Sequence, residues 1–253
     1  MKTEDKIRKK SVVAKKIRRQ RIFFASAVII ALVLICLFTP VFGVTSVTVE
    51  NNQILDDETI VRASGIKIGE NVFRVNTSDA EKSINMLGHI EKSEVKRKFP
   101  SRIVIEVTEC SEAAYVMFAG NYVSVDINGK VIDVSKAAKV QADKPVITGM
   151  ALKQFEKGSV FTASKPKKGE LVMNILTSLK KSGQLASVRK IDVSDADNAK
   201  ITLDTDTLVV LGDNTQIDYK LAYLTEVLKS LDNLRGGEID LSDTKNVIYK
   251  GGK

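Results

Sequence analysis

Four oxygen-bearing side chains lie close together in the second half of the chain: Asp192, Asp195, Asp197 and Asn198. Carboxylate and amide oxygens at such short spacing are ligands that calcium takes in a flexible loop. The calcium loop of helix–loop–helix proteins also needs Gly at its sixth position and Glu at its twelfth, and this stretch has neither. We therefore interpret residues 192–198 as a solvated loop and predict no metal site.

The other residues with possible chemistry are scattered. His89, the only histidine, directly follows Gly88, a predicted helix stop, so a turn is expected there. Four more polar residues are expected in turns between strands: Asp126, Asn128, Asp204 and Asp206. The chain has no HExxH motif, Cys/His cluster, phosphate-binding glycine loop or nucleophile elbow. We predict that the protein is not an enzyme, with no catalytic residue and no cofactor.

The elements before Cys110 describe a small α/β module. Residues 44–50 alternate as a β-branched strand, and Asp56 or Asp57 can begin a short helix that stops at Gly65. A second helix is predicted from 77 to about 87. Residues 95–99 and 102–109 then form a predicted hairpin.

The elements after Cys110 predict a mainly antiparallel sheet with two covering helices. Asn128-Gly129 between two β-prone runs, 122–125 and 130–132, is a strong hairpin signal. Apolar periodicity indicates helices over 170–182 and 219–231. Further strands are predicted at 145–149, 187–193, 199–204, 207–211 and 245–250. The predicted fold class of the whole chain is α+β.

The charge of the chain is concentrated at its N-terminus. Residues 1–21 contain ten Lys/Arg and two acidic residues, whereas the remainder contains 29 of each sign, so the head accounts for the formal net charge of +8. The next 21 residues, 22–42, are almost uncharged, and roughly 20 helical residues cross a bilayer. We predict a cytoplasmic basic tail (1–21), a single transmembrane helix (22–42) and an exported C-terminal part.

Two alternatives to an uncleaved anchor are less consistent with the sequence. A cleavable signal peptide has a shorter apolar run and small residues before its cleavage site, but here the candidate site is 41–43, Val-Phe-Gly. A soluble nucleic-acid binder would not place its basic residues against an apolar span in an otherwise neutral chain, so no nucleic-acid partner is predicted.

The sequence leaves the roles of one basic strand and of the cysteines open. Lys96, Arg97 and Lys98 could contact lipid head groups, a partner protein or solvent. Cys36 lies within the predicted span and Cys110 outside it, so no disulfide between them is expected. Cys110 is expected to be a small, buried or half-buried residue.

Several stretches, in order along the whole chain, resemble the FtsQ/DivIB family of bacterial cell-division proteins. The most characteristic is Ile90 to Glu109, a basic strand that turns through Phe-Pro-Ser into an Ile-rich strand ending in Glu. This chain has Asn51-Asn52 where the family usually has Gly-Asn, and Cys110 where Arg is common. The other matching stretches are 47–52, 64–65, 69–76, 125–131, 145–149, 211–212, 220–221 and 239–242.

The resemblance implies a non-enzymatic, type II single-pass scaffold of the division machinery. Residues 43–110 would form a POTRA-like domain and residues 111–253 the family's β domain. The implied partners are FtsL-like and FtsB/DivIC-like bitopic coiled-coil division proteins, and septal peptidoglycan synthases are a further possibility. The implied location is the cell membrane at the division septum, where the protein would help to control septal peptidoglycan synthesis.

The resemblance also implies a partner-binding region near the C-terminus. Some family members add a strand from the partner to the end of the β domain, which corresponds here to residues 240–250. An unpaired edge strand offers the backbone groups that such an addition needs. The alternative is that strand 245–250 completes the sheet internally. The implied partner-binding residues are Asp240, Leu241, Ser242, Asn246, Val247, Ile248 and Tyr249.

Two other function classes compete with the scaffold. A POTRA-type membrane-anchored chaperone or assembly module for exported proteins usually has several POTRA repeats or a following barrel. An anchored cell-wall enzyme needs an acid/base or nucleophile constellation, which the sequence does not suggest.

Overall fold

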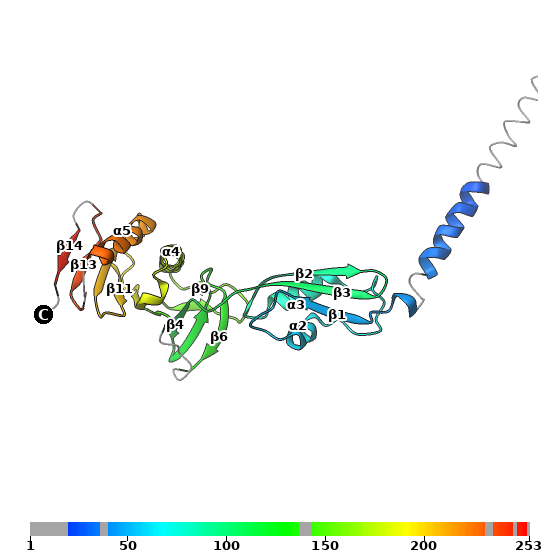
Figure 1. Cartoon of the computed structure of the whole chain (residues 1–253), viewed down its shortest axis with the longest axis horizontal. Helices are drawn as coiled ribbons and strands as arrows, with labels where there is room; N and C mark the ends of the chain where they lie inside the picture. The colour runs from blue at the N-terminus through cyan, green and yellow to red at the C-terminus, as the bar shows by residue number, and fades with distance from the viewer. Residues whose placement is uncertain (1–19, 36–39, 137–142, 231–234, 245–246, 252–253) are drawn as a thin grey trace, which may run out of the picture. The chain divides into compact units, whose positions relative to one another are not determined.

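The computed structural model describes residues 20–35, 40–136, 143–230, 235–244 and 247–251 (Figure 1). The chain divides into two compact units. The first contains Met1–Glu50, Asp57–Glu81 and Glu94–Glu106, and the second contains Asn51–Asp56, Lys82–Ser93 and Val107–Lys253.

Residues 20–35 are helical, and a short 3-10 helix, η1, follows at Pro40–Phe42. Across the ranges that the structure describes, no helix has both the length and the hydropathy needed to cross a membrane. The sequence places its predicted span at 22–42, and residues 36–39 of that span lie outside the described residues.

The N-terminal sheet has three strands, β1 (Ser46–Glu50), β2 (Ile90–Lys98) and β3 (Arg102–Glu109), in the order β1-β3-β2. β1 runs parallel to β3. Two short helices connect β1 to β2: α2 (Asp57–Ser64), after which Gly65 has φ +68, and α3 (Thr77–Asn85). These elements confirm the predicted order strand, helix, helix, strand, strand.

β2 begins five residues earlier than the sequence predicted. Its buried side chains are Ile90, Ser93 and Val95, so the spacing between them changes from three to two. Strict alternation of apolar and polar residues is the sequence signal for a strand, and this stretch lacks it because the inward spacing changes and one inward residue is a serine.

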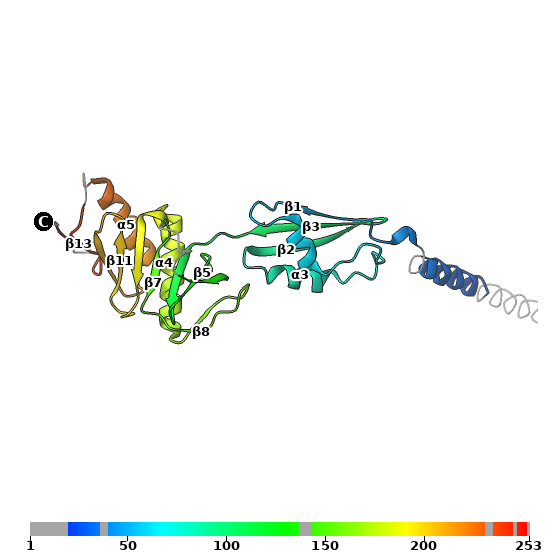
Figure 2. The same ribbon diagram turned by 90° about the horizontal axis from the view of Figure 1, so that it is seen from below.

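The second unit is built on a nine-stranded sheet. Figures 1 and 2 label several of its strands in two views. The strand order is β14-β13-β12-β11-β10-β7-β4-β5-β6. The bounds are β4 Ala114–Phe118, β5 Asn121–Val125, β6 Val131–Ser135, β7 Val146–Thr148, β10 Val188–Asp192, β11 Ala199–Leu203, β12 Leu208–Gly212, β13 Glu238–Asp240 and β14 Ile248–Lys250. A separate two-stranded sheet pairs β8 (Leu152–Gln154) with β9 (Thr162–Ala163).

Two helices cover the large sheet, as the sequence predicted. α4 spans Pro166–Lys181 and α5 spans Ile217–Ser230, and a 3-10 turn, η3 (Leu185–Ser187), leads into β10. Buried side chains from both helices join those of the strands in one hydrophobic core. α4 starts four residues before its predicted start because Pro166 occupies the first helical turn, where proline is well tolerated.

Most strand pairs of the large sheet are antiparallel, as the sequence predicted, and three pairs are parallel. β4–β5, β5–β6, β10–β11, β11–β12 and β13–β14 are antiparallel, whereas β4–β7, β7–β10 and β12–β13 are parallel. The sequence did not predict β4, β8, β9 or β13. β4 opens with three consecutive buried residues, and the other three are only two or three residues long, so none shows alternation.

Candidate partner-binding edge

Within the described ranges, β14 is the last strand at one edge of the nine-stranded sheet and pairs only with β13 (Figure 1). The antiparallel register places Asp240 opposite Ile248, Ile239 opposite Tyr249 and Glu238 opposite Lys250. Ile248 and Tyr249 are 51% and 42% exposed. An edge strand has one row of backbone N–H and C=O groups that no neighbouring strand pairs. β14 therefore offers a short template for an added strand, with two large exposed side chains on it.

Among the residues that the structure describes, two side-chain contacts attach the segment around β14 to the rest of the unit. Val247, just before the strand, packs against the hydrophobic core. Lys250 Nζ lies 3.3 Å from Glu238 Oε1, and surface pairs of this kind contribute little stability. Short length and weak attachment leave the strand dependent on its backbone pairing with β13.

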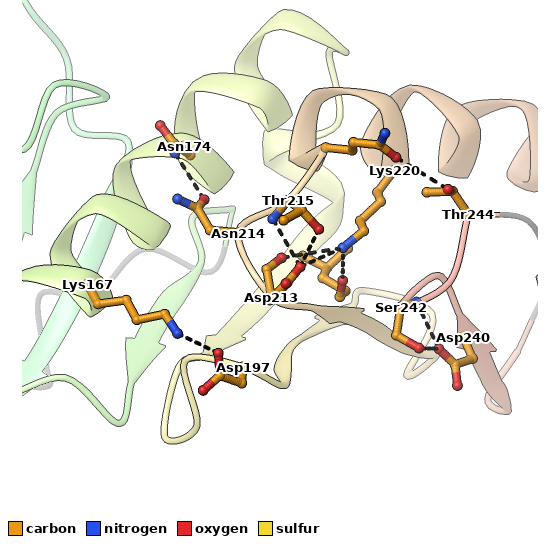
Figure 3. A network of polar contacts seen from close by, with 12 residues as sticks. Lys167, Asn174, Asp197, Asp213, Asn214, Thr215, Lys220, Asp240, Ser242 and Thr244 are labelled. Carbon is orange, nitrogen blue, oxygen red and sulfur yellow. Dashed lines mark hydrogen bonds and ion pairs between the residues drawn. The ribbon is translucent and has the colours of Figure 1, made fainter.

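The turn after β13 is ordered by Asp240. Its Oδ1 accepts hydrogen bonds from the N–H of Ser242 at 2.9 Å and from the Ser242 hydroxyl at 2.6 Å (Figure 3). The hydroxyl bond lowers the pKa of Asp240, although partial burial acts against it. Leu241 between them is only 1% exposed, and its N–H donates to the Val210 carbonyl at 2.8 Å. The side chain of Leu241 thus belongs to the core.

A buried lysine on α5, Lys220, hydrogen-bonds to the end of β12, next to the turn after β13. Lys220 Nζ donates to the main-chain oxygen of Leu211 at 2.7 Å, and its side chain is 1% exposed. The main-chain oxygen and Oδ1 of Asp213 lie at 3.4 and 3.5 Å from Nζ (Figure 3). Buried ammonium groups need such partners, because desolvation without them is costly. The hydrogen bonds of Lys220 therefore fix the end of β12.

Gly212, at the end of β12, packs against the turn that contains Asp240 and Ser242. Its φ is +73, and a Cβ at this position would lie 3.0 Å from the Cβ of Ser242. Only glycine combines that backbone conformation with so close an approach. Two stretches that separately resemble the family, 211–212 and 239–242, therefore contact each other directly.

The structure brings most of the predicted partner-binding residues into one region. Asp240 and Ser242 form the turn, and Ile248 and Tyr249 lie on the paired edge strand. Asn246 lies outside the described residues. Sequence reasoning did not assign Lys220 or Gly212 a role here. The sequence did contain a signal for the buried Lys220: it is a lone lysine on the apolar face of α5, among Ile217, Leu221 and Leu224.

The residues considered for calcium have other contacts. Asp192 Oδ1 accepts from the N–H of Ser194 at 2.9 Å, and Asp195 Oδ1 from the N–H of Asp197 at 3.0 Å. Asp197 pairs with Lys167 (Figure 3). Among the described residues, no group of His, Cys, Asp or Glu side chains has the arrangement to hold a metal ion.

A second buried lysine lies beside Cys110, in the hairpin between β5 and β6. Asp126 Oδ1 accepts the N–H groups of Asn128 and Lys130 at 2.8 and 2.7 Å, which confirms the predicted Asn-Gly turn. Lys130 Nζ donates to the carbonyls of Asn85 and Ile90, and burial lowers its pKa.

His89 lies in the turn before β2, as predicted.

Two protein-family models match this chain. The family model described as "POTRA domain, FtsQ-type" matches residues 42–109, and "Cell division protein FtsQ/DivIB, C-terminal" matches residues 114–242. A cell division protein DivIB of Clostridium botulinum (strain Hall) is 26% identical over 247 residues, 96% of this chain and 94% of the relative. DivIB of Clostridium tetani is 24% identical over 90% of this chain and 84% of the relative.

A solved structure of the major extracytoplasmic domain of DivIB from Geobacillus stearothermophilus is also similar. It is 16% identical, with a TM-score of 0.34, over 49% of this chain and 96% of that structure. The matched family models, in contrast, account for most of the sequence after residue 42. This chain belongs to the FtsQ/DivIB family of cell-division proteins.

Proposed function

We propose that the protein is a non-enzymatic, membrane-anchored scaffold of the bacterial division machinery. Its parts would be a cytoplasmic basic tail (1–21), a transmembrane helix (22–42), a POTRA domain (43–110) and a β domain (111–253). The basic head and the 21 uncharged residues after it support this topology, since positive residues stay on the cytoplasmic side.

The scaffold would bind its partner by strand addition at β14. The observation that carries this proposal is the position of β14 at the edge of the large sheet, with Ile248 and Tyr249 exposed. In such complexes the backbone hydrogen bonds supply affinity and alternate side chains supply specificity. Asp240 and Ser242 would form one end of the binding region, and Leu241 would contribute only through the core beneath it.

The partners would be FtsL-like and FtsB/DivIC-like bitopic proteins, whose extracytoplasmic segments lie on the same side of the membrane as the β domain. Binding them at the septum would let the scaffold influence septal peptidoglycan synthases without chemistry of its own. Membership of a cell-division family supports partners within this machinery.

Two proline variants test the edge. Neighbouring residues of an antiparallel strand direct their N–H groups to opposite sides, and proline has no N–H. One of the two variants, Ile248→Pro or Tyr249→Pro, therefore removes an N–H that points away from β13, towards an added strand. We call it the outward variant; the other removes an N–H that bonds to β13. We expect the outward variant to keep the fold and to weaken capture of the FtsL-like and FtsB/DivIC-like segments by at least tenfold. Surface-immobilised protein and purified partner segments would give the affinities.

Matched controls make the result specific to this edge. Ile248→Ala keeps the N–H and should bind more tightly than the outward proline variant. Val134→Pro alters β6, the strand at the opposite edge of the sheet, and should bind like the wild type. Normal binding by both folded β14 proline variants would rule out strand addition at β14.

The cellular role has its own test. A fluorescent fusion at the N-terminus should form a band at midcell before constriction begins. A uniform membrane signal throughout the cell cycle would contradict a role at the septum and would favour the chaperone or assembly-module alternative.

A further inference from the structure

Three phenylalanine rings gather at one end of the first unit. The ring centroids of Phe42 and Phe73 are 5.2 Å apart, and those of Phe73 and Phe99 are also 5.2 Å apart. Phe73 is 40% exposed and Phe99 is 58% exposed, and Val41 next to Phe42 is exposed as well. We call Val41, Phe42, Phe73 and Phe99 the aromatic tip. Exposed apolar side chains in contact with one another usually mark a binding surface.

Backbone hydrogen bonds tie the aromatic tip to the residues that follow the apolar segment. The carbonyl of Phe42 accepts from the N–H of Val72 at 2.8 Å, and Val44 N–H donates to the Glu70 carbonyl at 2.7 Å. Gly43 also forms an isolated β-bridge with Asn71. The loop that contains Phe73 is therefore fixed to the chain within two residues of Phe42.

Arg97 ties the same loop to the hairpin that contains Phe99. Its Nε donates to the Val72 carbonyl at 2.9 Å, and a terminal nitrogen donates to the Val75 carbonyl at 2.7 Å. Two hydrogen bonds from one guanidinium to two carbonyls hold the intervening residues in place. Phe73 and Phe99 thus stay exposed because the backbone around them is fixed.

The charges that flank the tip are almost all positive. The two segments that supply Phe73 and Phe99, residues 66–76 and 97–102, contain five basic residues and one acid, Glu70. The basic residues are all exposed: Lys67, Arg74, Arg97, Lys98 and Arg102. Aromatic rings together with Lys and Arg form the type of surface that lies in the interface of a membrane with anionic lipids.

We propose that the aromatic tip contacts the outer surface of the membrane, with its rings at the head-group boundary and its basic neighbours on anionic lipid. The inference rests on the proposed span at 22–42, because Phe42 is then the residue at which the chain leaves the bilayer. Every group hydrogen-bonded to residues 42–44 must then lie near that surface. A lipid contact would also restrict how the first unit rotates about the anchor, a constraint that the anchor alone does not supply.

The absence of tryptophan from the chain allows a direct test. Phe73→Trp and Phe99→Trp each introduce a single tryptophan into the full-length protein, which is reconstituted in vesicles that contain phosphatidylglycerol. We expect blue-shifted emission and at least twofold quenching by lipids brominated near the head group. Tyr219→Trp, at a 55% exposed position of α5 in the second unit, is the matched control and should be quenched only by aqueous acrylamide.

A fourth variant separates this inference from the proposed anchor. Leu32→Trp lies at the middle of the predicted span and should be quenched by lipids brominated deep in the acyl chains. If Leu32→Trp is quenched but both tip variants behave like Tyr219→Trp, the anchor stands and the lipid contact is overturned, which would assign the tip to a protein partner. If Leu32→Trp is not quenched either, the span and the inference both fail. Circular dichroism of each variant verifies folding.

Discussion

The Nζ of Lys220 donates a hydrogen bond to the main-chain oxygen of Leu211 at 2.7 Å, although the lysine side chain is almost completely buried. The next residue, Gly212, lies against Ser242 in the turn after β13. One buried cation on α5 therefore supports the end of β12, and through it the turn that leads towards the β14 edge.

Lys220→Met should lower the free energy of unfolding by about 1–3 kcal/mol, because the Leu211 carbonyl loses its buried donor. Thermal unfolding of the purified protein in detergent would measure the change. Lys229→Met on the same helix is the matched control: Lys229 is exposed and forms a surface ion pair with Glu226 in the same helix, so we expect a change within about 0.5 kcal/mol. Equal effects of the two variants would contradict a structural role for Lys220.

Gly212→Ala should destabilise the protein more than Gly183→Ala. Both glycines have positive φ, +73 and +72, so both variants incur the cost of a left-handed alanine, about 1–2 kcal/mol. Only at Gly212 would the new Cβ also lie 3.0 Å from Ser242, whereas at Gly183 it meets nothing within 4 Å. The Gly212→Ala loss of unfolding free energy minus the Gly183→Ala loss measures how tightly Gly212 packs against the turn. Equal losses would mean that the turn shifts away from the new Cβ at no cost.

Asp192 should contribute to stability at neutral pH and lose that contribution in acid. Partial burial alone would raise its pKa, but hydrogen bonds from Ser194 and Lys190 outweigh burial and lower the pKa from 3.8 to about 2. Because the folded-state pKa is depressed, the contribution is complete above pH 4 and disappears as the pH falls towards 2. Asp192→Asn should cost about 1 kcal/mol at pH 7, after allowance for solvent screening, and little at pH 2. Urea unfolding of the wild type and of Asp192→Asn between pH 7 and pH 2 would measure this cost. A loss of unfolding free energy that does not change with pH would contradict the prediction.

Cys110 should react slowly while the protein is folded. Burial is the main cause that raises the pKa of its thiol from 9.0 to about 11, and the nearby Asp126 carboxylate adds to it. The thiolate is the reactive form, so alkylation at pH 8 should be about a hundredfold slower than in urea-unfolded protein. Iodoacetamide labelling of a Cys36→Ser variant, followed by mass spectrometry, measures both rates. Labelling of the folded protein at the unfolded rate would contradict this assignment.

Local patterns predicted most of the elements, and weak local patterns explain the misses. The Asn128-Gly129 turn and helix α5 could be read from the sequence because turn chemistry and apolar periodicity act over a few neighbouring residues. β2 began earlier than predicted because Ser93 interrupts its inward-facing residues. β13 was missed because three residues are too few to show a period.

The sequence by itself determined the distribution of charge, the apolar segment, the order of the main elements and the similarity to a division family. Only the tertiary structure decided that β14 lies at an open edge beside β13, that Gly212 contacts Ser242, and that Phe42, Phe73 and Phe99 meet. These contacts join residues that are 26 to 31 positions apart or depend on the order of strands in a sheet. Strand order and long-range packing are set by how a whole core is filled, and no local pattern in a single sequence specifies them.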